Sequence, residues 1–82
     1  MMRIDKFLKN SRIIKRRTVA KEACDGERVT INGKIAKAGS TVEEGDLIGI
    51  RFGNRDLVVK VKALNEHAKK ADAPDMYEII ES

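Results

Sequence analysis

The chain has 82 residues, of which 41% are hydrophobic and 37% charged, and its formal net charge is +4 at pH 7. This length suits one small domain, and the regular recurrence of Val, Ile and Leu excludes a disordered chain. The single cysteine excludes an internal disulfide and a cysteine-based zinc site, and no apolar run is long enough to span a membrane. Because the start also lacks a secretory signal pattern, we expect a cytoplasmic protein.

The positive charge is concentrated at one end of the chain. Residues 1–21 contain eight cations and one carboxylate, a net charge of +7, whereas residues 22–82 contain nine cations and twelve carboxylates, a net charge of −3. A basic segment attached to a mildly acidic body indicates a polyanionic partner. Nucleic acid is the first candidate and an anionic membrane the second.

Residues 3–26, called the basic pole below, predict two short helices. Apolar residues first recur at the i, i+3 and i+4 spacing of one helical face. The second helix is expected to begin with Thr18 as its N-cap and to end where Gly26 adopts the left-handed conformation. If the apolar residues of this segment pack on one face of a sheet, the cations are left outward; we expect this core set to be Ile4, Phe7, Leu8, Ile13, Ile14 and Val19.

From residue 28 onward the hydrophobic period changes to two, which predicts strands. An Asn32-Gly33 turn between β-branched residues indicates a first hairpin, and residues 47–52 and 57–64 indicate a second. Residues 65–75 are polar and contain the only proline, which favours a surface loop. Residues 76–80 predict a final strand at a sheet edge.

These patterns predict an α+β fold in which two or three short N-terminal helices pack on a small antiparallel sheet of about four to five strands. We expect residues 1–82 to form a single domain, whose binding function is considered below. Its parts would be the basic pole at 3–26, the sheet at 28–64, the polar loop at 65–75 and the final strand at 76–80.

The sequence offers little for catalysis. It has no glycine-rich phosphate loop, and its one histidine, His67, lies in a polar stretch far along the chain from Cys24. Cys24 falls on the apolar side of the second helix, which favours a buried structural thiol. We therefore expect a non-enzymatic binding protein with no cofactor and no metal site.

Binding to structured RNA fits the remaining features. Arg16 and Arg17 stand just before the expected start of the second helix, so guanidinium forks and free backbone N–H groups could serve one phosphate site. Aromatic residues are few, and Phe7 and Phe52 are typical of core positions. We therefore expect recognition of RNA shape and backbone, and we do not expect stacking of unpaired bases.

Three alternatives compete with this interpretation. A helix-turn-helix DNA reader is disfavoured because Glu22 and Asp25 lie in the latter half of the second helix. A membrane-surface helix is disfavoured because Asn10 and Ser11 interrupt the apolar face. A solvated charged helix face without a partner stays open.

The pattern RIDKFL…SR…R…A…V.ING…K…V..GD.I, from Arg3 to about Ile50, resembles the S-four domain, a small RNA-binding module. That resemblance implies two helices on a short sheet, with RNA along the helical face. The opening RIDKFLKNSRIIKRRTVAKE and the ending MYEII resemble the small stand-alone S-four proteins of ribosome-associated quality control (the protein P family). Their fifteen-kilodalton heat-shock relatives carry a longer basic tail.

The resemblance implies binding to rRNA and peptidyl-tRNA on obstructed large ribosomal subunits. It also implies support of C-terminal alanine tailing by an RqcH-type tailing factor, without membrane binding. The alternative is a general structured-RNA or rRNA-binding accessory or chaperone with no role in tailing. No large apolar interface is evident, so we expect a monomer.

By position, the resemblance makes Arg3, Arg16 and Arg17 the principal RNA contacts. It also implies that Asp5 and Arg12 pair to orient the site. With the other cations of the basic pole and two groups beyond the first hairpin, the predicted RNA-binding residues are Arg3, Asp5, Lys6, Lys9, Arg12, Lys15, Arg16, Arg17, Lys21, Lys37 and Ser40.

The chain departs from the family pattern at one turn. The family has glycine two residues before the strand valine, where this chain has Glu27, with Gly26 one step earlier. Either Gly26 supplies the positive φ that ends the helix, or Glu27 does so at some cost.

Overall fold

A curved five-stranded antiparallel sheet is the centre of the computed structural model, which describes residues 1–81. Its strand order is β3-β2-β5-β6-β7, and β1 pairs with β4 in a separate two-stranded ribbon. In chain order the elements are β1 (Met2–Arg3), α1 (Ile4–Asn10), α2 (Arg17–Asp25), β2 (Val29–Ile31), β3 (Lys34–Ile35), β4 (Thr41–Val42), β5 (Leu47–Phe52), β6 (Arg55–Val61), the 3-10 helix η1 (Lys70–Met76) and β7 (Tyr77–Glu81). The predicted α+β class and antiparallel sheet are confirmed.

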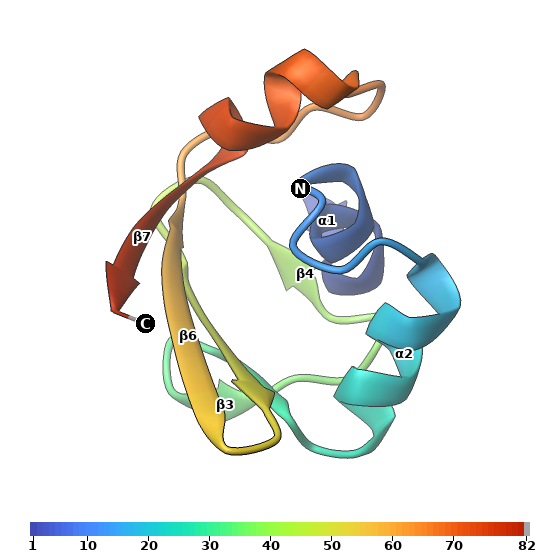
Figure 1. Ribbon diagram of the computed structural model, residues 1–82, viewed down its shortest axis with the longest axis vertical. Helices are drawn as coiled ribbons and strands as arrows, with labels where there is room; N and C mark the ends of the chain where they lie inside the picture. Colours follow the sequence, from blue (N-terminus) through green and yellow to red (C-terminus); the bar gives the residue numbers. More distant parts are fainter. Residues whose placement is uncertain (82) are drawn as a thin grey trace.

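Both α-helices lie on the same side of the sheet, and η1 crosses above α1 before the chain returns as β7 (Figure 1). Ile4, Phe7 and Leu8 of α1 are fully buried, as their helical spacing predicts. On β5, Ile48 and Ile50 point into the same core and their neighbours point away from it. The sheet therefore has one covered face and one open face.

Cys24 is completely buried in this core, which confirms the predicted structural thiol. Burial is the main reason that the pKa of its thiol rises to about 11, and the nearby charges of Asp5 and Asp25 raise it further. The thiol stays protonated at neutral pH and is unsuited to nucleophilic chemistry.

The two predicted hairpins are present. Asn32 and Gly33 have φ values of 52° and 85°, which are those of a type I′ turn. The Asn32 side chain also accepts a hydrogen bond from the Leu47 backbone N–H at 2.9 Å, so the turn is anchored to the neighbouring strand. In the second hairpin β6 begins at Arg55, two residues earlier than predicted, because the turn contains only Gly53 and Asn54.

The start of α2 differs from the prediction. The helix begins at Arg17 with Arg16 at the N-cap, so Thr18 lies inside the first turn and does not cap it. Val19 is 45% exposed, and its predicted burial is wrong. The core-facing stripe of α2 is formed instead by Ala20, Ala23 and Cys24, which a helical period places on a different face from Val19.

The second helix stops where it was predicted to stop, but Gly26 does not supply the left-handed residue. Gly26 has a φ of −83°, and Glu27, with a φ of 61°, takes the left-handed conformation. The Glu27 N–H then donates to the Cys24 carbonyl at 3.0 Å, and the Arg28 N–H donates to the Ala23 carbonyl at 2.9 Å. These two bonds form a Schellman motif, in which glycine at the Glu27 position would cost least.

The segment predicted as a polar surface loop, residues 65–75, contains regular structure. Residues 70–76 form η1, in which Ala73 and Met76 are buried. The final strand, β7, pairs with β6 and occupies the predicted sheet edge. Ile79 and Ile80 remain more than half exposed there. Among the described residues, no helix has the length and apolar character that crossing a membrane requires.

Replacing Glu27 with glycine should stabilise the protein by about 1 kcal/mol, because glycine adopts a positive φ without the Cβ clash of other residues. Urea unfolding would measure the change. Glu27→Ala is the matched control, since it removes the same carboxylate and keeps the Cβ. Equal stabilisation by both variants would assign the gain to lost charge and contradict the backbone explanation.

Candidate nucleic-acid interface

A buried carboxylate organises the basic pole. Asp5 lies in the first turn of α1 and is only 3% exposed. It accepts hydrogen bonds from Arg3 Nε at 3.3 Å and Arg3 Nη2 at 3.2 Å, from Arg17 Nη2 at 3.4 Å, and from the Lys6 backbone N–H at 2.8 Å. One side chain thereby joins β1, α1 and α2.

This carboxylate holds two predicted RNA-binding arginines side by side. The side chains of Arg3 and Arg17 are 52% and 48% exposed, respectively, while that of Asp5 is 4% exposed. A guanidinium has five N–H donors, so each arginine can contact Asp5 and still present donors to an anion outside. Asp5 thus fixes the orientation of the Arg3 and Arg17 guanidinium groups.

The predicted Asp5–Arg12 pair is wrong: within residues 1–81, the partners of Asp5 are Arg3 and Arg17. Asp5 lies at the N-terminal end of α1, whereas Arg12 follows its C-terminal end. The remaining five residues of α1, Lys6–Asn10, extend about 8 Å along the helix axis between them. Arg12 is exposed and has a left-handed φ of 62°.

The start of α2 presents cations beside open backbone donors. Its first helical hydrogen bond runs from the Ala20 N–H to the Arg16 carbonyl at 3.0 Å, so the preceding N–H groups lie outside the helical ladder. In the described part of the chain, no side chain caps this end, and its first turn contains no acidic residue. Such a terminus favours an anion, and Arg16 and Arg17 stand at it.

Lys6 differs from the other cations of the pole. Its Nζ lies 2.8 Å from Glu66 Oε2, and this hydrogen bond, together with the charge of Lys6, lowers the pKa of Glu66. Asn10 Nδ2 donates to the Asn65 carbonyl at 3.1 Å in the same place. Lys6 therefore helps to attach the segment before η1 to α1. The described residues show no ion pair for the other exposed cations of the pole, which are Lys9, Arg12, Lys15, Arg16 and Lys21.

The fold places the turn at residues 37–40 beside Arg3. The Ile4 N–H donates to the Ser40 carbonyl at 2.7 Å, and Arg3 pairs with Thr41 between β1 and β4. The Ser40 hydroxyl accepts a hydrogen bond from the Lys37 backbone N–H at 3.0 Å, which closes the turn. Lys37 and Ser40 thus adjoin the pole, and their contact with RNA stays a prediction.

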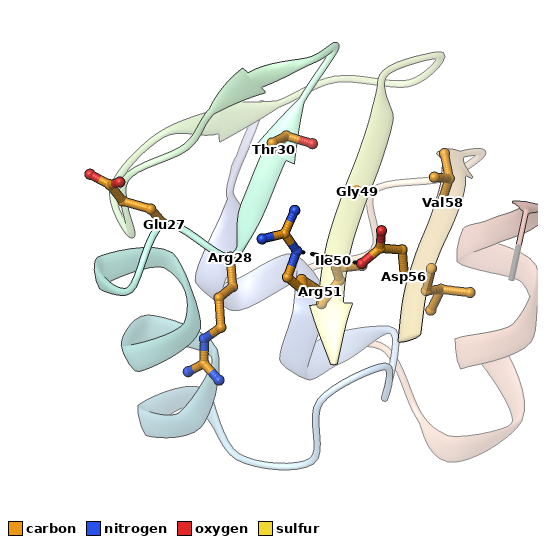
Figure 2. A pocket seen from close by; sticks show the side chains of 9 residues that line it. Glu27, Arg28, Thr30, Gly49, Ile50, Arg51, Asp56 and Val58 are labelled. Atoms are coloured by element: carbon orange, nitrogen blue, oxygen red, sulfur yellow. Dashed lines mark ion pairs between the residues drawn. The ribbon is translucent and has the colours of Figure 1, made fainter. Parts of the chain in front are cut away.

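Two arginines outside the pole, Arg28 and Arg51, are not among the predicted RNA-binding residues but lie close to it. Arg51 of β5 donates its backbone N–H to the Arg28 carbonyl at 2.9 Å, which brings together residues far apart in the chain. Figure 2 shows the Arg28 side chain extending alongside α2, whereas Arg51 reaches toward Asp56. The Arg51–Asp56 ion pair is 3.6 Å long and both side chains are about 70% exposed, so it holds Arg51 weakly.

Beside these arginines the open face of the sheet has a hollow whose lining includes Thr30, Gly49 and Val58 (Figure 2). A Cβ at Gly49 would lie 2.5 Å from Thr30 Oγ1, so the Thr30 hydroxyl occupies the space that a side chain at position 49 would need. No contiguous run in the sequence signals this surface, because its residues come from the separate strands β2, β5 and β6.

Residues 2–48, more than half of the chain, match the family model of the S4 domain, so the chain belongs to the S4 domain family. Within that family it is similar to proteins named RQC P-site tRNA stabilizing factor. It is 54% identical to the Streptococcus pneumoniae protein of that name over 79 residues, which cover 96% of this chain and 90% of the relative. It is 52% identical to the Bacillus subtilis protein over 79 residues, which cover 96% and 92%.

A solved structure supports the fold. The trimeric structure of Vibrio cholerae Heat Shock Protein 15 has a TM-score of 0.87 with this chain and is 29% identical to it. The match covers 95% of this chain and 80% of that one. The predicted resemblance to the S-four domain, to the quality-control proteins and to their heat-shock relatives is confirmed.

Asp5→Asn should lower the free energy of unfolding by about 1–3 kcal/mol, because the two guanidiniums lose their charged partner in a buried site. Glu66→Gln is the matched control, since it neutralises a carboxylate whose pair with Lys6 is exposed and should leave stability nearly unchanged. Urea unfolding of both variants makes the comparison. An equal loss in both would contradict a special role for the buried carboxylate.

Proposed function

We propose that this chain binds rRNA and peptidyl-tRNA on obstructed large ribosomal subunits, and that it acts by holding tRNA in place. The observation that carries the proposal is the pair Arg3 and Arg17, oriented by buried Asp5 beside the open start of α2. The curated relatives named RQC P-site tRNA stabilizing factor support it.

The charge distribution suits a one-sided contact. Residues 1–21 have a net charge of +7 and the rest of the chain has −3, so the chain would approach a polyanion with its helical side. Phosphate contacts position a protein on RNA without reading its sequence. Specificity for an obstructed subunit would then come from rRNA and tRNA phosphates that match the pole in shape.

We further propose that binding supports C-terminal alanine tailing by an RqcH-type tailing factor. In this role the chain contributes no chemistry of its own; it keeps the peptidyl-tRNA positioned while the tailing factor acts. The predicted contacts are the residues of the pole together with Lys37 and Ser40. The protein would act as a monomer, although the Vibrio heat-shock relative was solved as a trimer.

The double variant Arg16→Ala, Arg17→Ala should weaken binding to ribosomal RNA and lower the slope of log Kd against log salt by about one unit per lost phosphate contact. Arg17 also donates to buried Asp5, so the melting temperature should fall, and binding is compared at a temperature where the variant is fully folded. Fluorescence anisotropy at several salt concentrations measures the slope.

The matched control for this variant is Lys60→Ala, Lys62→Ala, which removes the same charge from exposed positions at and just beyond the end of β6. It should change binding much less, because these lysines lie outside the pole. Equal weakening by the two double variants would show that only net charge matters and would contradict a localised interface.

A second test separates the proposed function from that of a general RNA chaperone. The protein should sediment with large subunits that carry peptidyl-tRNA in preference to intact ribosomes and free rRNA, as the proposed function requires. Similar binding to all three would favour the chaperone alternative. Sequencing of cross-linked RNA from the same fractions would locate the contact.

A further inference from the structure

An apolar pocket of about 370 Å³ adjoins the basic pole. It lies between the α1–α2 connection, the first half of α2 and the β5–β6 turn. Its lining includes the apolar residues Ile13, Val19 and Phe52 together with Arg28 and Arg51. Its volume lies within the usual range for small-ligand pockets, of about 300–1,000 Å³.

The protein's own packing leaves this pocket open. Val19 is 45% exposed, and Ile13 and Phe52 are only partly buried against the core. All three were expected in the core from their sequence positions. Covering these partly exposed apolar side chains with a ligand would remove apolar surface from water and favour binding.

The polar groups of the pocket limit what could cover it. Among the described residues, its lining includes two arginines and no carboxylate. Arg28 has no ion pair in residues 1–81, and that of Arg51 is weak. A guest with an apolar part and a negative charge fits this lining. Arginine also stacks on aromatic rings and binds phosphate, and both properties match a nucleotide.

The position of the pocket favours RNA as the source of that nucleotide. Two walls, Ile13 and Val19, flank the cations Lys15, Arg16 and Arg17 in the chain. An RNA backbone held at the start of α2 therefore passes within one or two residues of the pocket. A peptide with acidic and apolar residues has the same gross chemistry, but the proposed function already brings an RNA backbone to this place.

We propose that the pocket receives one unstacked nucleotide of the bound RNA, with its base between Val19 and Phe52 and its phosphate at Arg28 or Arg51. The inference rests on the proposed RNA-binding function and adds a base contact to a surface that otherwise holds phosphates. A base with apolar side chains on both sides recovers part of the stacking that it loses on leaving a helix.

The test uses three RNA hairpins of one stem sequence: one fully paired, one with a single bulged adenine, and one with an abasic site at the bulge. Anisotropy titrations should show that the unaltered protein binds the bulged adenine about tenfold more tightly than the abasic hairpin, a gain in the lower part of the range for base stacking. Phe52→Leu and Val19→Ser should abolish this preference and retain binding to the paired stem.

Arg16→Ala, Arg17→Ala should weaken binding to all three hairpins and leave the preference for the bulge. If the unaltered protein binds all three RNAs equally and with salt dependence, the pocket takes no base and the RNA-binding function stands. If it binds none of them, both proposals fail.

If Phe52→Leu unfolds, Val19→Ser decides, because Val19 is exposed. A bulged 4-thiouridine should also cross-link within residues 13–19 or 50–53, and cross-linking confined to other residues would overturn the assignment.

Discussion

The buried carboxylate of Asp5 is the contact on which the functional surface depends. It satisfies one backbone N–H and two guanidiniums from three different elements, so the orientation of α2 against α1 and the orientation of the arginines are set together. A carboxylate with 3% exposure is costly unless all its partners stay in place. Arg3 and Arg17 are therefore held before any RNA arrives, and less side-chain freedom is lost on binding. The same interaction serves the fold and the site.

The sheet explains why the cations gather on one side. The inner face of the sheet is covered by the buried side of α1 and by the small buried residues of α2, so the outer sides of both helices face solvent with the charged residues. The residue after the C-cap of each helix, Arg12 or Glu27, has the left-handed conformation in which glycine would be least costly. At the end of α1 this strained position is occupied by Arg12, which adds a cation to the pole.

Packing is complete around Asp5 and incomplete around Val19. The small residues Ala20 and Ala23 of α2 allow close contact with the core, whereas Val19 turns outward and leaves the pocket between α2 and the β5–β6 turn. The expectation that unpaired bases would find no stacking site assumed that Phe52 was buried. Because Phe52 is only partly buried, the protein combines a phosphate-binding surface with a candidate base pocket within one short segment.

The sequence by itself determined the features with local causes. The Asn32-Gly33 hairpin follows from the φ values that only a few residues accept, and the buried faces of α1 and β5 follow from periods of 3.6 and two. The concentration of cations in residues 1–21 needs no structure to be seen. Only the tertiary structure decided which charges meet. It paired Asp5 with Arg17 rather than Arg12, tied Lys6 to Glu66 across 60 residues, and set Arg28 beside Arg51. Such contacts depend on how helices dock on a sheet and how strands align, and no spacing along the chain encodes these long-range geometries.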